Sequence, residues 1–149
     1  MACEIWEQNY SSKRIVLLGI AKKGPAIAEL LANSLASIEC PVAVECHTIS
    51  IDKSNPSSES FKLSTDLKPQ AGDVVIIVDD VLYTGRTMMH SIVPFVEAGF
   101  EKVQMAVLVF RDYLKYPIRP DFVGLALAST TVEHVDVSVN NTLVEAYLN

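Results

Sequence analysis

Runs of apolar residues along the chain predict the strands of a buried sheet. The strongest run, residues 74–78, is continuous and consists only of valine and isoleucine, and residues 14–20 and 102–110 have a similar character. Uninterrupted apolar runs are typical of strands that are covered on both faces, as in a parallel sheet. We therefore expect these three segments to lie inside a parallel sheet.

Segments with helical spacing separate these strands. Residues spaced three or four positions apart form a mainly apolar stripe along one face of a predicted helix: Ile27, Leu30, Leu31, Ser34 and Leu35. This helix opens near Pro25, which suits a first turn, and runs to about Ser37. Residues 88–98 predict another helix, closed by Gly99, and residues 1–9 resemble the last turns of a third. The alternation predicts right-handed crossovers in an α/β fold, with a central parallel sheet of about four or five strands flanked by helices.

The remaining segments carry weaker patterns. Residues 41–51 alternate enough for a further strand, residues 121–125 and 131–137 predict two short strands, and residues 140–149 predict a turn with a short strand or helix. His47 and His134 lie within alternating segments, so we interpret both as structural residues rather than as ligands or catalytic bases. The short final elements would form a small C-terminal hood beside the sheet.

Residues 52–72 form a long connector that is rich in Ser, Lys, Asp and Pro. A connector of this length inside a compact domain is usually functional or disordered. Its composition supplies no evident anchor to the core. We therefore expect residues 53–70 to be the least ordered internal segment when no ligand is bound.

Composition narrows the class of protein. Half of the 149 residues are hydrophobic and 20% are charged, which predicts one folded domain over residues 1–149. The net charge of −6 argues against broad attraction to nucleic acid or membranes. Three cysteines without a CxxC pair favour idle thiols in a reducing cytoplasm over a zinc site. No apolar run has the length of a membrane span and no signal peptide is visible, so we expect a cytoplasmic protein.

The residues most suited to binding or catalysis follow directly after residues 74–78. Asp79 and Asp80 follow this strand at its carboxyl end, where open α/β sheets bind their ligands. The next loop, residues 83–87, combines hydroxyls, a flexible glycine and an arginine at a helix start, which suits a phosphate. Carboxylates accept hydrogen bonds from vicinal hydroxyls, so the two features together describe a phosphosugar site. The alternative interpretation of this segment is an ordinary Asp-rich turn followed by a helix N-cap. That interpretation does not explain the paired acids or the composition of the loop.

This segment resembles the phosphoribosyl pyrophosphate (PRPP) motif of type I phosphoribosyltransferases. That motif is an apolar strand, two acids, three variable residues and Thr-Gly-x-Thr. The resemblance implies that Tyr83, Thr84, Gly85, Arg86 and Thr87 bind the 5′-phosphate of PRPP. It also implies that the two acids bind the ribose hydroxyls and stabilise positive charge on the ring.

A second loop follows the strand at residues 14–20. Residues 19–24 have the glycine spacing of half a Walker loop, but Pro25-Ala26 stands where Lys-Ser/Thr is required, which excludes an ATPase. The family resemblance implies that Ala21, Lys22, Lys23 and Gly24 bind pyrophosphate. The residues alone leave a solvated lysine pair as an equal alternative, although lysines are unfavourable beside a helix N-terminus unless an anion lies there.

Within this family, the chain is most similar to the pyrimidine-operon attenuator/uracil phosphoribosyltransferases. The similar segments are residues 18–20, 81–87, 106–109 and 116–124. The resemblance implies that the Phe122 ring packs on the face of the nucleobase and that the backbone of Val123 contacts the edge of the base. From the sequence alone, it is an equal alternative that Phe122 is a core residue. Residues 47–53 and 110–114 depart from the family pattern, and we expect a short N-terminal part of the hood.

The resemblance implies transfer of 5-phosphoribosyl from PRPP to a nucleobase, expected to be uracil, with release of pyrophosphate. Mg²⁺ would be held through PRPP rather than by a protein cage. The departures in the catalytic loop leave turnover open. The alternatives are a PRPP- or nucleotide-sensing regulator that binds RNA, which the acidic balance disfavours, and a structural subunit with a vestigial site. We expect a homodimer, as is common in the family.

Overall fold

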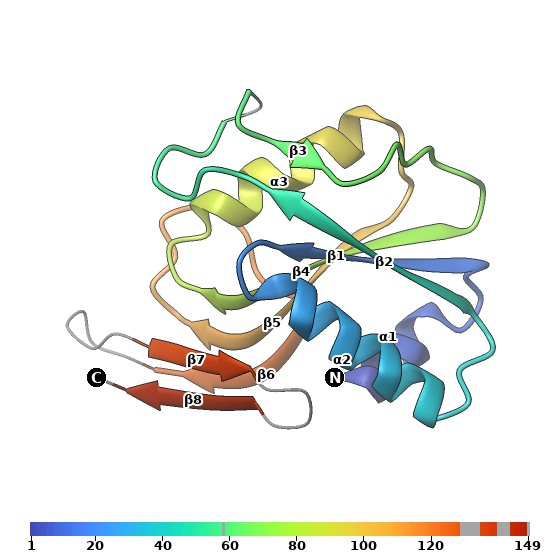
Figure 1. Ribbon diagram of the computed structural model, residues 1–149, viewed down its shortest axis with the longest axis horizontal. Coiled ribbons are helices and arrows are strands. Elements are labelled where there is room, and N and C mark those ends of the chain that lie inside the picture. Colours follow the sequence, from blue (N-terminus) through green and yellow to red (C-terminus); the bar gives the residue numbers. More distant parts are fainter. Residues whose placement is uncertain (58, 129–134, 140–143, 149) are drawn as a thin grey trace.

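The computed structural model describes residues 1–57, 59–128, 135–139 and 144–148. The described residues form a six-stranded sheet in the order β3-β2-β1-β4-β5-β6, three helices and a separate β7–β8 pair (Figure 1). The strands of the main sheet are β1 (Arg14–Ile20), β2 (Ala43–Ser50), β3 (Lys62–Leu63), β4 (Asp73–Leu82), β5 (Val103–Arg111) and β6 (Phe122–Leu127). The other elements are α1 (Ala2–Asn9), α2 (Gly24–Ser37), α3 (Arg86–Glu97), β7 (Val135–Val139) and β8 (Val144–Leu148).

The sheet is parallel except at one edge, as the sequence predicts. β1 pairs in parallel with β2 and β4, and β5 pairs in parallel with β4 and β6. β4 therefore lies at the centre, which confirms the interpretation of residues 74–78 as a buried strand. The short β3 pairs antiparallel with the last residues of β2, so residues 43–47 of β2 have no strand on their outer side among the described residues.

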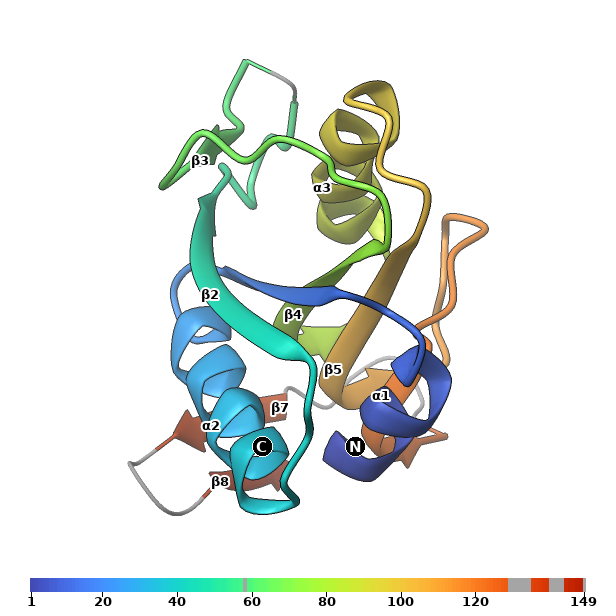
Figure 2. The ribbon, with the colours of Figure 1, turned by 90° about the vertical axis from the view of Figure 1, so that its right-hand side faces the viewer.

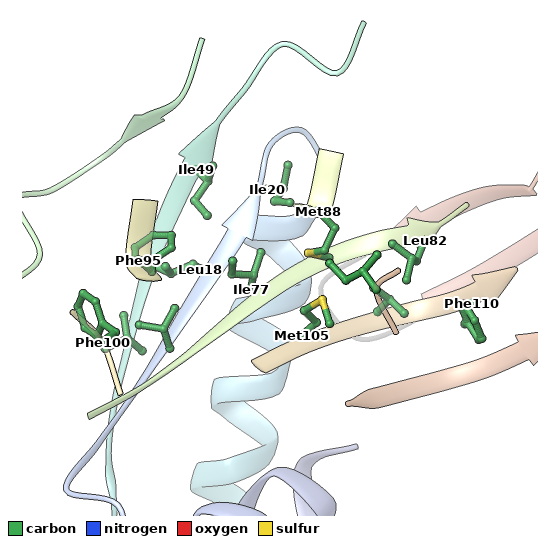
Figure 3. Close-up of a cluster of buried hydrophobic side chains, with 14 residues drawn as sticks. Leu18, Ile20, Ile49, Ile77, Leu82, Met88, Phe95, Phe100, Met105 and Phe110 are labelled. Atoms are coloured by element: carbon green, nitrogen blue, oxygen red, sulfur yellow. The ribbon is translucent and has the colours of Figure 1, made fainter. Parts of the chain in front are cut away.

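Helices cover both faces of the sheet, and this explains the uninterrupted apolar runs. α1 and α2 lie on one face and α3 lies on the other (Figure 2). Successive residues of β1 point to opposite sides, so Ile15 and Leu17 pack toward α2 while Val16 and Leu18 pack toward α3. Figure 3 shows Phe95 of α3 close to Leu18 in this second layer. None of the described helices is long and apolar enough to cross a membrane.

The connector between β2 and β4 is attached to the core, contrary to expectation. Phe61, Leu63 and Leu67 pack against the cluster beneath α3. The Phe61 ring meets the Phe95 ring edge to face, with centroids 5.9 Å apart. The expectation that this segment lacks an anchor is therefore wrong, because three separated apolar residues give no periodic pattern and yet reach one cluster. The expected mobility of residues 53–70 stays a prediction.

The C-terminal strands form the expected small hood. β7 and β8 pair antiparallel, and Val135 and Val137 pack against Val109 of β5. The hairpin lies beside β5 and β6 in Figure 1. Of the predicted strand at residues 131–137, residues 135–137 are observed, and the rest, with His134, lies outside the described residues.

Candidate active site

The predicted site lies at the carboxyl ends of β1 and β4. These strands are neighbours, and the chain continues from them in opposite directions, from β1 to β2 and from β4 to β5. At such a reversal the loops that follow the two strands diverge and leave a crevice. The loop at residues 21–23 and the loop at residues 83–85 border this crevice.

Two glycines bring the first loop close to β4. A Cβ on Gly19 would lie 2.3 Å from the backbone nitrogen of Pro25, and a Cβ on Gly24 would lie 2.6 Å from the carbonyl oxygen of Val78. Side chains at either position would push α2 away from the sheet. This close packing places Lys23 beside the acids, with Nζ 3.6 Å from Oδ2 of Asp80. The glycine spacing is visible in the sequence, but its role in this close packing is not.

The acids lie within β4 rather than after it, which corrects the predicted strand end. Asp79 and Val81 continue the parallel pairing with Val107 and Val109 of β5, so β4 extends to Leu82. The pairing holds the backbone of the acids rigidly. Their side chains consequently project from a fixed edge of the sheet rather than from a turn.

Burial changes the acidity of Asp79. The residue is 5% exposed, and desolvation raises the pKa of its carboxyl to about 7. The Lys53 ammonium opposes this rise, whereas the neighbouring Asp80 carboxylate reinforces it. Near neutral pH the carboxyl can therefore be neutral or ionised, and a nearby cation favours the ionised form.

A lysine that the sequence analysis missed contacts both acids. Lys53 Nζ lies 2.9 Å from Oδ1 and 3.1 Å from Oδ2 of Asp79, and 3.9 Å from Oδ1 of Asp80. Lys53 follows β2 at the same edge of the sheet as the acids. That position was the available clue, but it lay in a polar connector with no recognisable pattern.

The predicted phosphate loop has the geometry of an anion site. Gly85 caps α3 with φ of 84°, a left-handed conformation that favours glycine. The first amides of α3 have no acceptor within the helix, and Thr84 Oγ1 accepts a hydrogen bond from the Arg86 amide at 3.4 Å. Residues 83–87 line a cavity of about 110 Å³ together with Lys53 and Asp79. The five predicted phosphate residues are thus brought together.

A larger cavity of about 720 Å³ adjoins the first loop. Ala21, Lys22 and Lys23 line it with Asp80 and the start of the connector, whereas Gly24 lies behind it against β4. Three of the four predicted pyrophosphate residues therefore face one cavity. The Ala21–Lys22 peptide bond in this loop is cis.

The predicted nucleobase residues lie on opposite faces of β6. Phe122 is 1% exposed and packs in the core on the side of α1 and α2, whereas Val123 is half-buried and packs toward the cluster beneath α3. This burial favours the core interpretation of Phe122, because its ring would have to leave the core to reach a ligand. A base-binding role for Val123 stays a prediction.

An aromatic stack that the sequence did not predict holds the start of the phosphate loop. The rings of Tyr83 and Tyr113 are 5.1 Å apart and nearly parallel, and the Arg111 guanidinium lies 4.6 Å from the centre of the Tyr83 ring. Arg111 is buried at the end of β5. The stack therefore ties the loop to the neighbouring strand.

The described residues contain no group of three or more His, Cys, Asp or Glu side chains that could hold a metal ion. The adjacent carboxylates of Asp79 and Asp80 are a poor cage by themselves. Mg²⁺ binds readily where substrate phosphates and water complete its octahedron. The donor set fits an ion that arrives with a phosphorylated substrate.

Comparison with known proteins gives consistent matches. A family model of the phosphoribosyl transferase domain matches residues 1–142. The bifunctional protein PyrR of Brevibacillus brevis is 37% identical over 145 residues, covering 93% of this chain and 81% of the relative. The bifunctional protein PyrR of Staphylococcus carnosus is 37% identical over 152 residues, covering 95% of this chain and 85% of the relative.

Solved structures support the fold. The hypoxanthine phosphoribosyltransferase of Trypanosoma cruzi matches with a TM-score of 0.73 at 18% identity, over 90% of this chain and 75% of that one. A hypoxanthine-guanine phosphoribosyltransferase from Bacillus anthracis matches with a TM-score of 0.63 at 20% identity, over 85% of this chain and 71% of that one. The predicted type I phosphoribosyltransferase fold is confirmed. From the family model and the PyrR relatives, the chain belongs to the phosphoribosyl transferase domain family, within the group that contains the PyrR proteins.

Proposed function

We propose that this protein transfers the 5-phosphoribosyl group of PRPP to a ring nitrogen of a nucleobase and releases pyrophosphate. The observation that carries the proposal is the position of Asp79 and Asp80 between two cavities. Asp79 lines the cavity of the phosphate loop, and Asp80 lines the cavity of the lysine loop. PRPP has the same order of groups, with the ribose diol between the 5′-phosphate and the pyrophosphate.

The two loops would hold the two ends of PRPP. Residues 83–87 offer the 5′-phosphate backbone amides, two threonine hydroxyls and the N-terminus of α3. Lys22 and Lys23 offer the pyrophosphate two cations and the adjoining amides. Mg²⁺ bound to PRPP would neutralise charge on the leaving pyrophosphate. The overall negative charge of the protein makes these local donors necessary.

Catalysis would rest on position and electrostatics. As the bond from C1 to pyrophosphate breaks, positive charge builds on the ribose ring. The base nitrogen then bonds to C1, and its proton passes to solvent or to the released pyrophosphate. The carboxylates of Asp79 and Asp80 would stabilise the charge on the ring, and the burial of Asp79 would strengthen its contribution. Fixed placement of both reactants lowers the entropic part of the barrier, and no covalent intermediate is required.

Uracil is the nucleobase that we propose, because the PyrR relatives agree with the resemblance to uracil phosphoribosyltransferases. Val123 on β6 is the proposed contact to the base edge. The test is pyrophosphate release from PRPP with uracil, cytosine, hypoxanthine and guanine in turn, with the nucleotide product identified by mass. Uracil-dependent formation of UMP is the expected result. Turnover with hypoxanthine alone would refute the choice of base.

A second candidate is a PRPP-sensing regulator that binds RNA. The observation that favours it is the segment at the end of β2 and the start of the connector, where residues 47–53 depart from the catalytic-loop pattern of the family. PRPP binding without pyrophosphate release, together with salt-dependent binding of pyrimidine-operon leader RNA, would support this candidate over the enzyme.

We also propose that the protein is a homodimer. Val93 and Val96 on α3 are 42% and 60% exposed, which leaves apolar surface for a partner. Light scattering at micromolar concentration tests this proposal, and a monomer would refute it.

A further inference from the structure

Lys53 covers the carboxyl group of Asp79. The ammonium group of Lys53 donates hydrogen bonds to both carboxyl oxygens of Asp79, at 2.9 and 3.1 Å. Oδ1 of Asp79 also accepts a hydrogen bond from the backbone amide of Asp80 at 3.0 Å. The Asp79 side chain is 7% exposed. A ribose diol that is to bind Asp79 must therefore displace the Lys53 ammonium first.

A displaced Lys53 would lie in a second cavity. Lys53 lines both the small cavity of the phosphate loop and the large cavity of the lysine loop. Its side chain is 42% exposed, so it can leave the acids without disturbing the core. In the large cavity it would join Lys22 and Lys23 around any bound polyanion.

We propose that Lys53 switches partners during substrate binding. In the ligand-free protein it neutralises Asp79 and Asp80, and when a sugar diol takes its place it turns to the pyrophosphate group in the large cavity. This inference rests on the proposed function and adds a residue that couples the ribose position to the leaving-group position. The switch also keeps a cation next to the buried acids until the substrate arrives, since an unpaired buried charge is costly.

The test uses two calorimetric titrations, one with ribose 5-phosphate alone and one with pyrophosphate in the presence of saturating ribose 5-phosphate, whose diol would already have displaced Lys53 from the acids. In Lys53→Met, pyrophosphate should bind about tenfold more weakly or worse, because one charge-assisted contact is lost. Ribose 5-phosphate should bind as well as to the wild type or more tightly, because its diol no longer competes with the ammonium. The matched control is Lys68→Met, which removes the same charge from the same connector at an exposed ion pair with Asp66 and should change neither affinity.

An equal loss of affinity for both probes in Lys53→Met would overturn the proposal, because it would indicate a general effect of charge or structure. Unchanged pyrophosphate affinity would overturn it as well. Lys53→Arg retains the charge and should restore most of the pyrophosphate affinity.

Hydrogen exchange on the wild type adds a test that does not depend on the variants. Ribose 5-phosphate should speed exchange at the amides of residues 52–57, and further addition of pyrophosphate should slow it. No change with ribose 5-phosphate would refute the switch. A wild type that binds neither probe nor PRPP would instead refute the proposed function.

Discussion

Replacing Gly85 with alanine tests the phosphate loop directly. Gly85 has φ of 84°, and a Cβ there would lie 2.6 Å from Cγ2 of Ile118. The left-handed conformation costs an alanine about 1–2 kcal/mol, and the contact with Ile118 forces the loop or that side chain to move. Because a charge-assisted hydrogen bond contributes roughly 1.5–3 kcal/mol, the loss of one loop amide should weaken PRPP binding about tenfold to a hundredfold. Gly85→Val should abolish binding.

The same helix provides the control. Gly99 follows the other end of α3 with φ of 87°, and no described atom lies within 4 Å of a Cβ built there. Gly99→Ala should therefore lose only the backbone cost of about 1–2 kcal/mol in its free energy of unfolding, measured with urea, while its PRPP affinity by calorimetry stays at the wild-type value. Wild-type PRPP affinity in folded Gly85→Ala would refute the assignment of residues 83–87 to the phosphate.

Three further predictions follow from the charged residues. Asp79→Asn and Asp80→Asn should each still bind PRPP, though more weakly than the wild type. Their single-turnover rates should fall by a larger factor than their PRPP affinities, because the lost charge matters most in the transition state. Equal losses of rate and affinity would argue against stabilisation of the transition state by these acids. The pKa of Asp79 is raised from 3.8 to about 7 in the folded protein, so its contribution to stability is fully present below pH 3.8 and is lost as the pH rises from there to about 7. Asp79→Asn should remove this decline in urea unfolding followed from about pH 5 to about pH 8, and an unchanged pH profile would contradict the raised pKa. Arg14 holds the pKa of buried Asp73 below its usual value, so Arg14→Met should lower the free energy of unfolding by about 3 kcal/mol. The control Lys68→Met breaks an exposed ion pair and should lower it by at most about 0.5 kcal/mol. Similar unfolding midpoints for the two variants would contradict this prediction.

The sequence predicted the parts of the fold that depend on local pattern. Residues 14–20 and 74–78 are covered on both faces, so burial leaves a continuous apolar run that can be read without a structure. The helix stripe of α2 is equally local, because a helix that packs on a sheet buries a single face. The predicted end of β4 was wrong because the strand continues through two acids, whose pairing with β5 is a property of the sheet and not of the residues.

Contacts between distant segments could not be predicted in this way. Lys53 meets Asp79 across 26 positions of sequence, and Phe61 meets Phe95 across a similar gap. Neither residue belongs to a periodic pattern, so composition alone suggested a loose connector. For Phe122, the sequence left the core and the base-binding interpretations equal, and only the burial of its ring in the core on the side of α1 and α2 favours the core.

The open side of β2 has a consequence for the behaviour of the protein at high concentration. No strand among the described residues pairs with the outer side of residues 43–47, and an unpaired strand edge is the feature that recruits foreign strands into aggregates. Glu45 lies within this stretch and pairs with Arg14 of β1, and His47 lies 3.4 Å from the same carboxylate. A strand that docked here would have to desolvate these charges. The ionic groups therefore protect the chain against self-association through this edge, and this protection should weaken in high salt, where exposed ion pairs are screened.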